Sequence, residues 1–148
     1  MLLLPKNTAI KMIEVHKTNN PFEIAAERGI TLLFEPLGET LGYYNCYKRI
    51  QFIHINNNLD ESIKKFVCAH ELGHALMHRD SNTSFLKANT FYSIDRIEVE
   101  ANTFAVELMM PDEVIYNYKD SNLSINEVAS IYGVPEEVAH LKKVSRFY

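Results

Sequence analysis

Apolar and polar positions along the first third of the chain change from a helical to a strand-like period. Apolar residues at helical spacing predict a first helix over residues 8–18. Asn20 followed by Pro21 is typical of a helix start, and Gly29 is typical of a helix end. Runs of β-branched and apolar residues then predict three strands, at residues 30–34, 40–46 and 48–55.

The rest of the chain is predicted to be helical. A helix capped by Asn58 or Asp60 runs to about His78, and its apolar residues lie nearly all the way round, which predicts a central, buried helix. The remaining predictions are a polar connection over 80–93, a helix from Asp95 to Pro111, a short helix near 112–118, a helix with a Ser124–Glu127 capping box, and a last helix opening at Pro135. Helices around a short three-stranded sheet make an α+β fold.

Length and composition fit one globular domain. The chain has 148 residues, of which 47 % are hydrophobic and 23 % charged. We therefore expect a single domain over residues 1–148, with a helical C-terminal segment from about 112. The net charge of -4 argues against a nucleic-acid partner, which normally meets a basic patch.

No stretch of the sequence predicts export or insertion into a membrane. No run approaches the roughly 18 apolar residues that a span needs, and the four apolar residues at the N-terminus are too few for a signal peptide. Cys46 and Cys68 are too few for a disulfide framework. We therefore expect a cytoplasmic protein.

Residues 124–146 resemble a helix-turn-helix, with Gly133 at the turn. The second helix of this pair opens with Glu136 and Glu137, where a DNA reader needs positive or amide side chains. We expect this segment to pack against the other helices or to recognise a protein partner.

The sequence His70-Glu71-Leu72-Gly73-His74 carries the candidate chemistry. Two histidines four residues apart on a helix present both imidazoles on one face, so both can bind one metal ion. Glu71 follows the first histidine, where its carboxylate reaches the water that the metal activates and serves as general base. Zinc suits this task because it binds imidazole and carboxylate and keeps one position open.

A third protein ligand is expected on the helix that follows Asp95. Glu98 lies beside the predicted apolar face of that helix, whereas Glu100 falls on a polar stripe that we expect to face water. Glu98 is therefore the favoured ligand and Glu100 the alternative. Asn102, one turn beyond Glu98, is placed to accept a hydrogen bond from a ligand histidine.

Together these segments resemble the ImmA/IrrE family of metallopeptidases. The resemblance rests on the His-Glu-x-x-His helix, on Glu98-Val99-Glu100-Ala101-Asn102-Thr103-Phe104-Ala105, and on Leu108-Met109-Met110-Pro111. It implies a small zincin-like domain of gluzincin type, with His70, His74 and Glu98 as zinc ligands and Glu71 as general base. It also implies an endopeptidase that cleaves a helix-turn-helix repressor, as the anti-repressors of prophages do.

An alternative function is a zinc-containing regulatory module that binds such a repressor, or an antitoxin-like partner, without cutting it. We expect neither a nucleic acid nor a membrane as partner, and the sequence leaves the oligomeric state open.

Other residues are candidates for supporting roles. His78, one turn past His74, is expected to cap the helix C-terminus rather than to contact the zinc ligands. The strand at 48–55 is a candidate to pair its edge with an extended substrate. The oxyanion of the transition state needs a donor, and the candidates are Tyr43, Tyr44, Tyr92 and Arg96.

Overall fold

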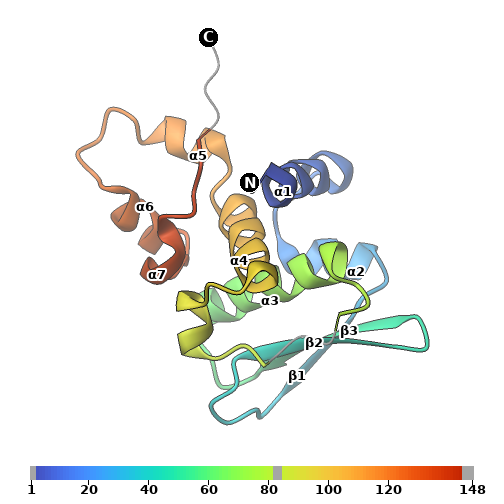
Figure 1. The fold of residues 1–148 in the computed structure, drawn as a ribbon. Helices are drawn as coiled ribbons and strands as arrows, with labels where there is room; N and C mark the ends of the chain where they lie inside the picture. The colour runs from blue at the N-terminus through green and yellow to red at the C-terminus, as the bar shows by residue number, and fades with distance from the viewer. Residues whose placement is uncertain (1–2, 82–84, 145–148) are drawn as a thin grey trace.

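The computed structural model describes residues 3–81 and 85–144, and these form helices around one three-stranded sheet. The α+β prediction is confirmed, with a long helix that carries the His-Glu-x-x-His motif at the centre (Figure 1). In the described part of the chain, no helix is long and apolar enough to cross a membrane. The elements are α1 (Leu3–His16), α2 (Pro21–Glu27), β1 (Thr31–Glu35), β2 (Gly42–Tyr47), β3 (Ile50–Asn56), α3 (Glu61–Met77), the 3₁₀ helix η1 (Ala88–Tyr92), α4 (Arg96–Met109), α5 (Asp112–Asn117), α6 (Ile125–Ile131) and α7 (Glu136–Ala139).

Several helix boundaries follow directly from local chemistry. The Asn20 side chain accepts hydrogen bonds from the first turn of α2, and Ser124 and Glu127 form the predicted capping box of α6. The first helix begins at Leu3, five residues before the predicted start, because Pro5 is tolerated in a first helical turn.

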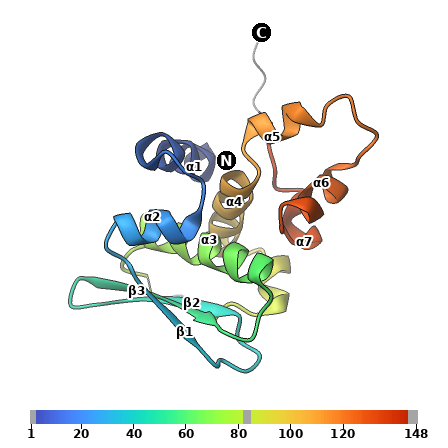
Figure 2. The same ribbon diagram turned by 180° about the vertical axis from the view of Figure 1, so that it is seen from behind.

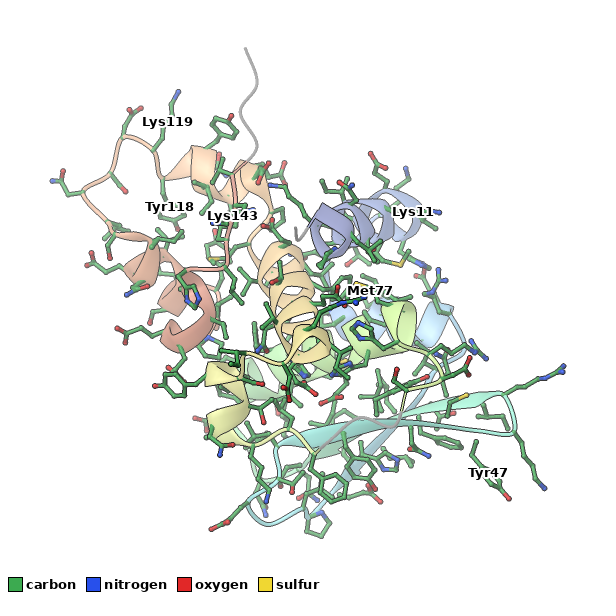
Figure 3. The ribbon with its side chains drawn as sticks, viewed as in Figure 1. Lys11, Tyr47, Met77, Tyr118, Lys119 and Lys143 are labelled. Atoms are coloured by element: carbon green, nitrogen blue, oxygen red, sulfur yellow. The ribbon has the colours of Figure 1, made fainter. Side chains whose placement is uncertain are left out.

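Strand order corrects one prediction. The order is β1-β3-β2, with β3 parallel to β1 and antiparallel to β2. Because β3 is paired on both sides, the strand predicted at 48–55 has no free edge for a substrate, and that prediction is wrong. One edge of the sheet is therefore β2, which joins β3 through a hairpin at Lys48 and Arg49, next to the labelled Tyr47 in Figure 3.

The sheet lies against α3, and α3 lies against α4 (Figures 1 and 2). The inner face of the sheet contributes Tyr44, Ile53 and Ile55, all buried. On the other side of α3, a Cβ at Gly73 would lie 3.1 Å from Phe104 Cδ2 and 3.3 Å from the Ala101 Cα. The glycine therefore lets the two helices approach closely, which places the side chains of α4 beside the motif.

Helix α4 is covered on several sides, which corrects a second prediction. It packs against α3, α1 and α7. The stripe expected to face water, made of Glu100, Thr103 and Glu107, is buried. Helical periodicity identified the most apolar face of α4 correctly, but it does not show how many neighbours cover the opposite face.

Glu107 is stabilised by a buried charge cluster that links the two ends of the chain. Lys142 Nζ lies 2.7 Å from both Glu107 Oε1 and Asp112 Oδ1, and Lys6 Nζ donates to Asp112 Oδ1 at 2.9 Å. The segment at Lys143, labelled in Figure 3, returns to α4, where its backbone N–H donates to Glu107 Oε2 at 3.0 Å. Two ammonium groups and two carboxylates thus balance one another.

Replacing Lys142 with methionine should lower the free energy of unfolding by about 3 kcal/mol, because it leaves a buried carboxylate with too little compensating charge. Urea denaturation followed by circular dichroism measures this loss.

The matched control is Lys64→Met, which removes the exposed Glu61–Lys64 pair and should change stability by less than about 1 kcal/mol. Equal losses in the two variants would show that the buried cluster adds no more to stability than a surface pair.

Candidate metal centre

Helix α3 presents two imidazoles to one point. His70 and His74 are buried, and their rings lie 4.9 Å apart between centroids at an interplanar angle of 80°. The two histidines lie one helical turn apart on α3, with β2 on one side of the helix and α4 on the other. The Nε2 atom of each histidine faces α4.

Glu98 of α4 meets both histidines. Its Oε1 lies 3.1 Å from His70 Nε2 and 3.1 Å from His74 Nε2. The far side of the His70 ring is held by α4 as well, because His70 Nδ1 lies 2.8 Å from Asn102 Oδ1. The Asn102 amide nitrogen points to the Thr90 carbonyl, so its oxygen faces the ring and accepts the Nδ1 proton. Both orientations match the sequence expectations for Glu98 and Asn102.

This arrangement fits a metal cation. With its proton on Nδ1, a neutral His70 directs a lone pair from Nε2 at a carboxylate oxygen, and two acceptors at that distance repel each other unless a cation lies between them. A tetrahedral zinc ion with ligands at the usual bond lengths would separate an imidazole nitrogen from a carboxylate oxygen by about 3.4 Å. The distance from each histidine Nε2 to Glu98 Oε1 is close to this, at 3.1 Å. His70, Glu71 and His74 also offer ligand atoms that all lie within 4.8 Å of one another.

The two acidic groups at this point, Glu98 and Glu71, differ in their contacts. One Glu98 oxygen is equidistant from both histidines, whereas neither Glu71 oxygen has a hydrogen-bond partner. In the metal-free protein, burial raises the pKa of Glu98, but His70 and His74, which can donate from Nε2 when no cation lies between them, outweigh burial and lower that pKa to about 2. Glu98 therefore stays an anion, as a metal ligand must.

Glu71 is the anomaly of the site. Its carboxylate is fully buried, and both oxygens lack a partner, which is rare for a buried carboxylate. Burial, with a smaller contribution from the Glu98 charge, raises the pKa of Glu71 to about 8. A carboxylate kept without partners beside a metal position is suited to exchange a proton with a molecule bound there.

Strand β2 passes close to this carboxylate because it has a glycine at the crossing. A Cβ at Gly42 would lie 2.6 Å from Val67 Cγ1 and 2.7 Å from the His54 carbonyl oxygen, and 3.8 Å from Glu71 Cγ. Only glycine fits this position without a shift of the backbone. The sequence analysis did not single out Gly42, and a glycine at the start of a predicted strand was the signal that could have found it.

A cavity of about 290 Å³ leads to Glu98 from outside, lined by Asn89, Thr90, Ser93 and Asp95. A larger cavity of about 600 Å³ lies elsewhere, between α1 and the start of α5. Of these two cavities, the smaller one is relevant to the centre, because Glu98 is part of its lining.

Glu100 and His78 both lie differently from what the sequence predicts. Glu100 does not face water: its Oε1 lies 2.7 Å from His78 Nε2, and Arg96 Nε donates to its Oε2 at 3.3 Å. The backbone of His78 occupies the C-cap of α3, but its ring does not cap the helix carbonyls. Instead the ring lies between Glu100 and His74, with 3.0 Å between the two Nδ1 atoms.

Three of the four oxyanion candidates, Tyr43, Tyr44 and Arg96, are engaged in other contacts. The Tyr44 hydroxyl donates to the Arg79 carbonyl at 2.6 Å. The Tyr43 ring stacks on His54, 4.0 Å between centroids, on the sheet face away from α3. Arg96 is engaged with Glu100, while the Tyr92 side chain is exposed to solvent, at 71 %.

A helix with the His-Glu-x-x-His motif, a carboxylate from a second helix and a small sheet beside them define a metallopeptidase. The chain belongs to the family of the IrrE N-terminal-like domain, whose model matches residues 25–142. It is a metallo-endopeptidase of the ImmA/IrrE type.

Its relatives include three named proteins. It is 45 % identical over 143 residues to "Uncharacterized immunity region protein 2" of Bacillus phage phi105, covering 96 % of this chain and 90 % of that protein. It is 32 % identical over 141 residues to "Metallopeptidase ImmA" of Bacillus subtilis, covering 93 % of this chain and 82 % of that protein. It is 35 % identical over 91 residues to "Radiation response metalloprotease IrrE" of Deinococcus deserti, covering 59 % of this chain and 31 % of that protein.

The raised pKa of Glu71 predicts a pH dependence for the metal-free protein. The pKa is about 8 in the fold and 4.5 ordinarily, so between these values the folded state keeps a proton that the unfolded state has released. Stability from this group is therefore present at low pH and falls as pH rises from about 4.5 to 8, by at most about 1.4 kcal/mol per pH unit.

Urea denaturation of chelator-treated wild type and Glu71→Gln at several pH values measures this effect. The uncharged variant should gain stability relative to wild type as the pH rises. A difference between the two proteins that stays constant over this range would contradict the shift.

Proposed function

We propose that this metallo-endopeptidase uses zinc, that His70, His74 and Glu98 bind it, and that Glu71 is the general base. The observation that carries this proposal is the Glu71 carboxylate, buried without a partner beside three converging acceptor atoms. A structural metal site would need no such group, because a closed site has no molecule to exchange protons with.

The donor set supports zinc over other divalent ions. Two imidazole nitrogens and one carboxylate oxygen form a borderline-soft set, whereas magnesium and calcium prefer oxygen ligands alone. When bound, zinc supplies a Lewis acid that makes a water molecule a nucleophile near neutral pH.

Glu71 then carries the proton through the reaction. Its carboxylate accepts a proton from the attacking water, whose oxygen bonds to the carbonyl carbon of the scissile peptide. The same group delivers that proton to the peptide nitrogen as the C–N bond breaks, which leaves one new carboxyl and one new amine terminus. In the metal-free protein, burial raises the pKa of Glu71 to about 8, well above its ordinary value, which suits a carboxylate that must both accept and release a proton.

Edge strand β2 is suited to align an extended substrate. It crosses α3 at Gly42, beside Glu71, and among the described residues Leu86 alone forms a bridge to its outer edge, at Gly42. A peptide that pairs with the rest of this edge would have its backbone fixed by main-chain hydrogen bonds next to the general base.

We further propose that the substrate is a helix-turn-helix transcriptional repressor, which makes the protein an anti-repressor. The support comes from the family resemblance and from two relatives, one named ImmA and one named for a phage immunity region. The net charge of -4 favours a protein substrate over direct binding to DNA.

Zinc-loaded protein, incubated with the helix-turn-helix regulator encoded beside it, should convert that regulator into discrete fragments, detected by intact-mass spectrometry. Glu71→Gln should retain zinc but lower the cleavage rate by about 10²- to 10⁴-fold, because the general base is lost. Glu98→Gln should lose both cleavage and stoichiometric zinc.

The matched control is Glu61→Gln, a change at an exposed position of the same helix, which should cleave like wild type. If the regulator stays whole with wild type and with Glu71→Gln, and forms a stable complex with both, the non-proteolytic regulatory module is the correct function. If wild type binds no zinc, the metal assignment fails.

A further inference from the structure

The second metal histidine is in contact with a chain of polar side chains that leads away from the metal centre. His74 Nδ1 lies 3.0 Å from His78 Nδ1, and His78 Nε2 lies 2.7 Å from Glu100 Oε1. The side chains of His74, His78 and Glu100 are 1 %, 7 % and 10 % exposed. Water is therefore largely excluded from these contacts, and each must be satisfied by the neighbouring side chain.

One arrangement of protons satisfies every contact in this chain with neutral rings. The Glu100 carboxylate only accepts, so His78 Nε2 must carry a proton. A neutral His78 then offers a lone pair at Nδ1, which accepts the proton that His74 carries on its own Nδ1. That leaves a lone pair on His74 Nε2, the atom that faces Glu98 Oε1 at 3.1 Å.

We propose that His78 and Glu100 are positioning residues for His74, which hold its ring in the tautomer and orientation that direct the Nε2 lone pair at the metal. This inference rests on the proposed zinc site. Neither residue touches the ion or the substrate in this arrangement, so both act through His74.

Helix geometry explains why these residues are available. His74 and His78 are four residues apart on α3, which places their rings side by side, 5.1 Å apart between centroids. Glu98 and Glu100 are two residues apart on α4 and diverge from the helix, so one carboxylate reaches the metal side of His74 and the other reaches His78.

The two metal histidines are consequently held in different ways. His70 donates directly to a neutral amide, the Oδ1 of Asn102. His74 donates to an imidazole that itself donates to a carboxylate, and the carboxylate accepts from Arg96 at 3.3 Å. An acceptor polarised by a carboxylate makes the ligand ring more electron-rich, which strengthens its bond to a cation.

The alternative is that His78 and Glu100 form an interhelical pair that only fastens the end of α3 to α4. Zinc affinity separates the two roles, because a fastening pair affects folding stability and leaves the tautomer of His74 unchanged.

The test compares zinc dissociation constants, measured by competition with a chromogenic chelator, for wild type, His78→Phe and His78→Gln. Phenylalanine fills the space but accepts no proton, so His78→Phe should weaken zinc binding by about 10- to 100-fold. Glutamine carries one acceptor and one donor, so His78→Gln should bind within a few-fold of wild type. His140→Phe, a change at an exposed histidine of the C-terminal segment, should leave the constant unchanged.

Long-range proton–nitrogen NMR of the zinc-loaded wild type gives a second readout that needs no variant. His74 should show protonated Nδ1, and His78 should show protonated Nε2 with a bare Nδ1. A His78 ring protonated on Nδ1, or wild-type zinc affinity in His78→Phe, overturns the positioning role.

His74→Leu distinguishes failure of the inference from failure of the proposed site. If His74→Leu loses zinc while His78→Phe binds as wild type does, the site stands and the positioning role is overturned. If His74→Leu binds zinc as tightly as wild type, the proposed site fails, and the inference fails with it.

Discussion

The close approach of α3 and α4 is the constraint on which the metal centre depends. Each helix carries half of the candidate site: two imidazoles and the Glu71 carboxylate on α3, and a carboxylate and an amide on α4. A side chain at Gly73 would meet Phe104 and the backbone at Ala101 at 3.1 to 3.3 Å, so a larger residue there would push the helices apart. Because imidazole and carboxylate must converge to within a few ångströms, a small increase in that separation would disperse the ligand atoms.

Close packing of α4 on several sides also means that several charged groups of this molecule are buried. Glu100 is compensated by His78 with Arg96, and Glu107 by Lys142 with a backbone N–H, whereas Glu98 faces the Nε2 atoms of His70 and His74. Glu71 is the exception, since both of its oxygens are buried without a partner. The contrast within one small core shows that the fold can satisfy buried carboxylates, and among the described residues it leaves Glu71 as the buried carboxylate without a partner.

Local sequence signals predicted most of the helices and strands and named the side chains of the candidate site. Capping at Asn20 and at Ser124 acts within one helical turn, so those boundaries could be read from neighbouring residues alone. The same holds for His70 and His74, because a helix fixes the relation between positions i and i+4. The exceptions were the start of α1 at Leu3 and the short 3₁₀ helix at Ala88–Tyr92, where no strong cap or periodicity marks the element.

The sequence by itself determined the chemistry of this protein: which side chains can bind a metal, their spacing along a helix, and the class of fold that presents them. Only the tertiary structure decided which strand lies at the edge of the sheet, that Glu100 is buried against His78, and that Gly42 lies beside Glu71. The physical reason is that these features depend on contacts between residues far apart in the chain. Periodicity records how polar each face of α4 is, but the neighbours that cover a face are fixed only when α1, α3 and α7 pack around it.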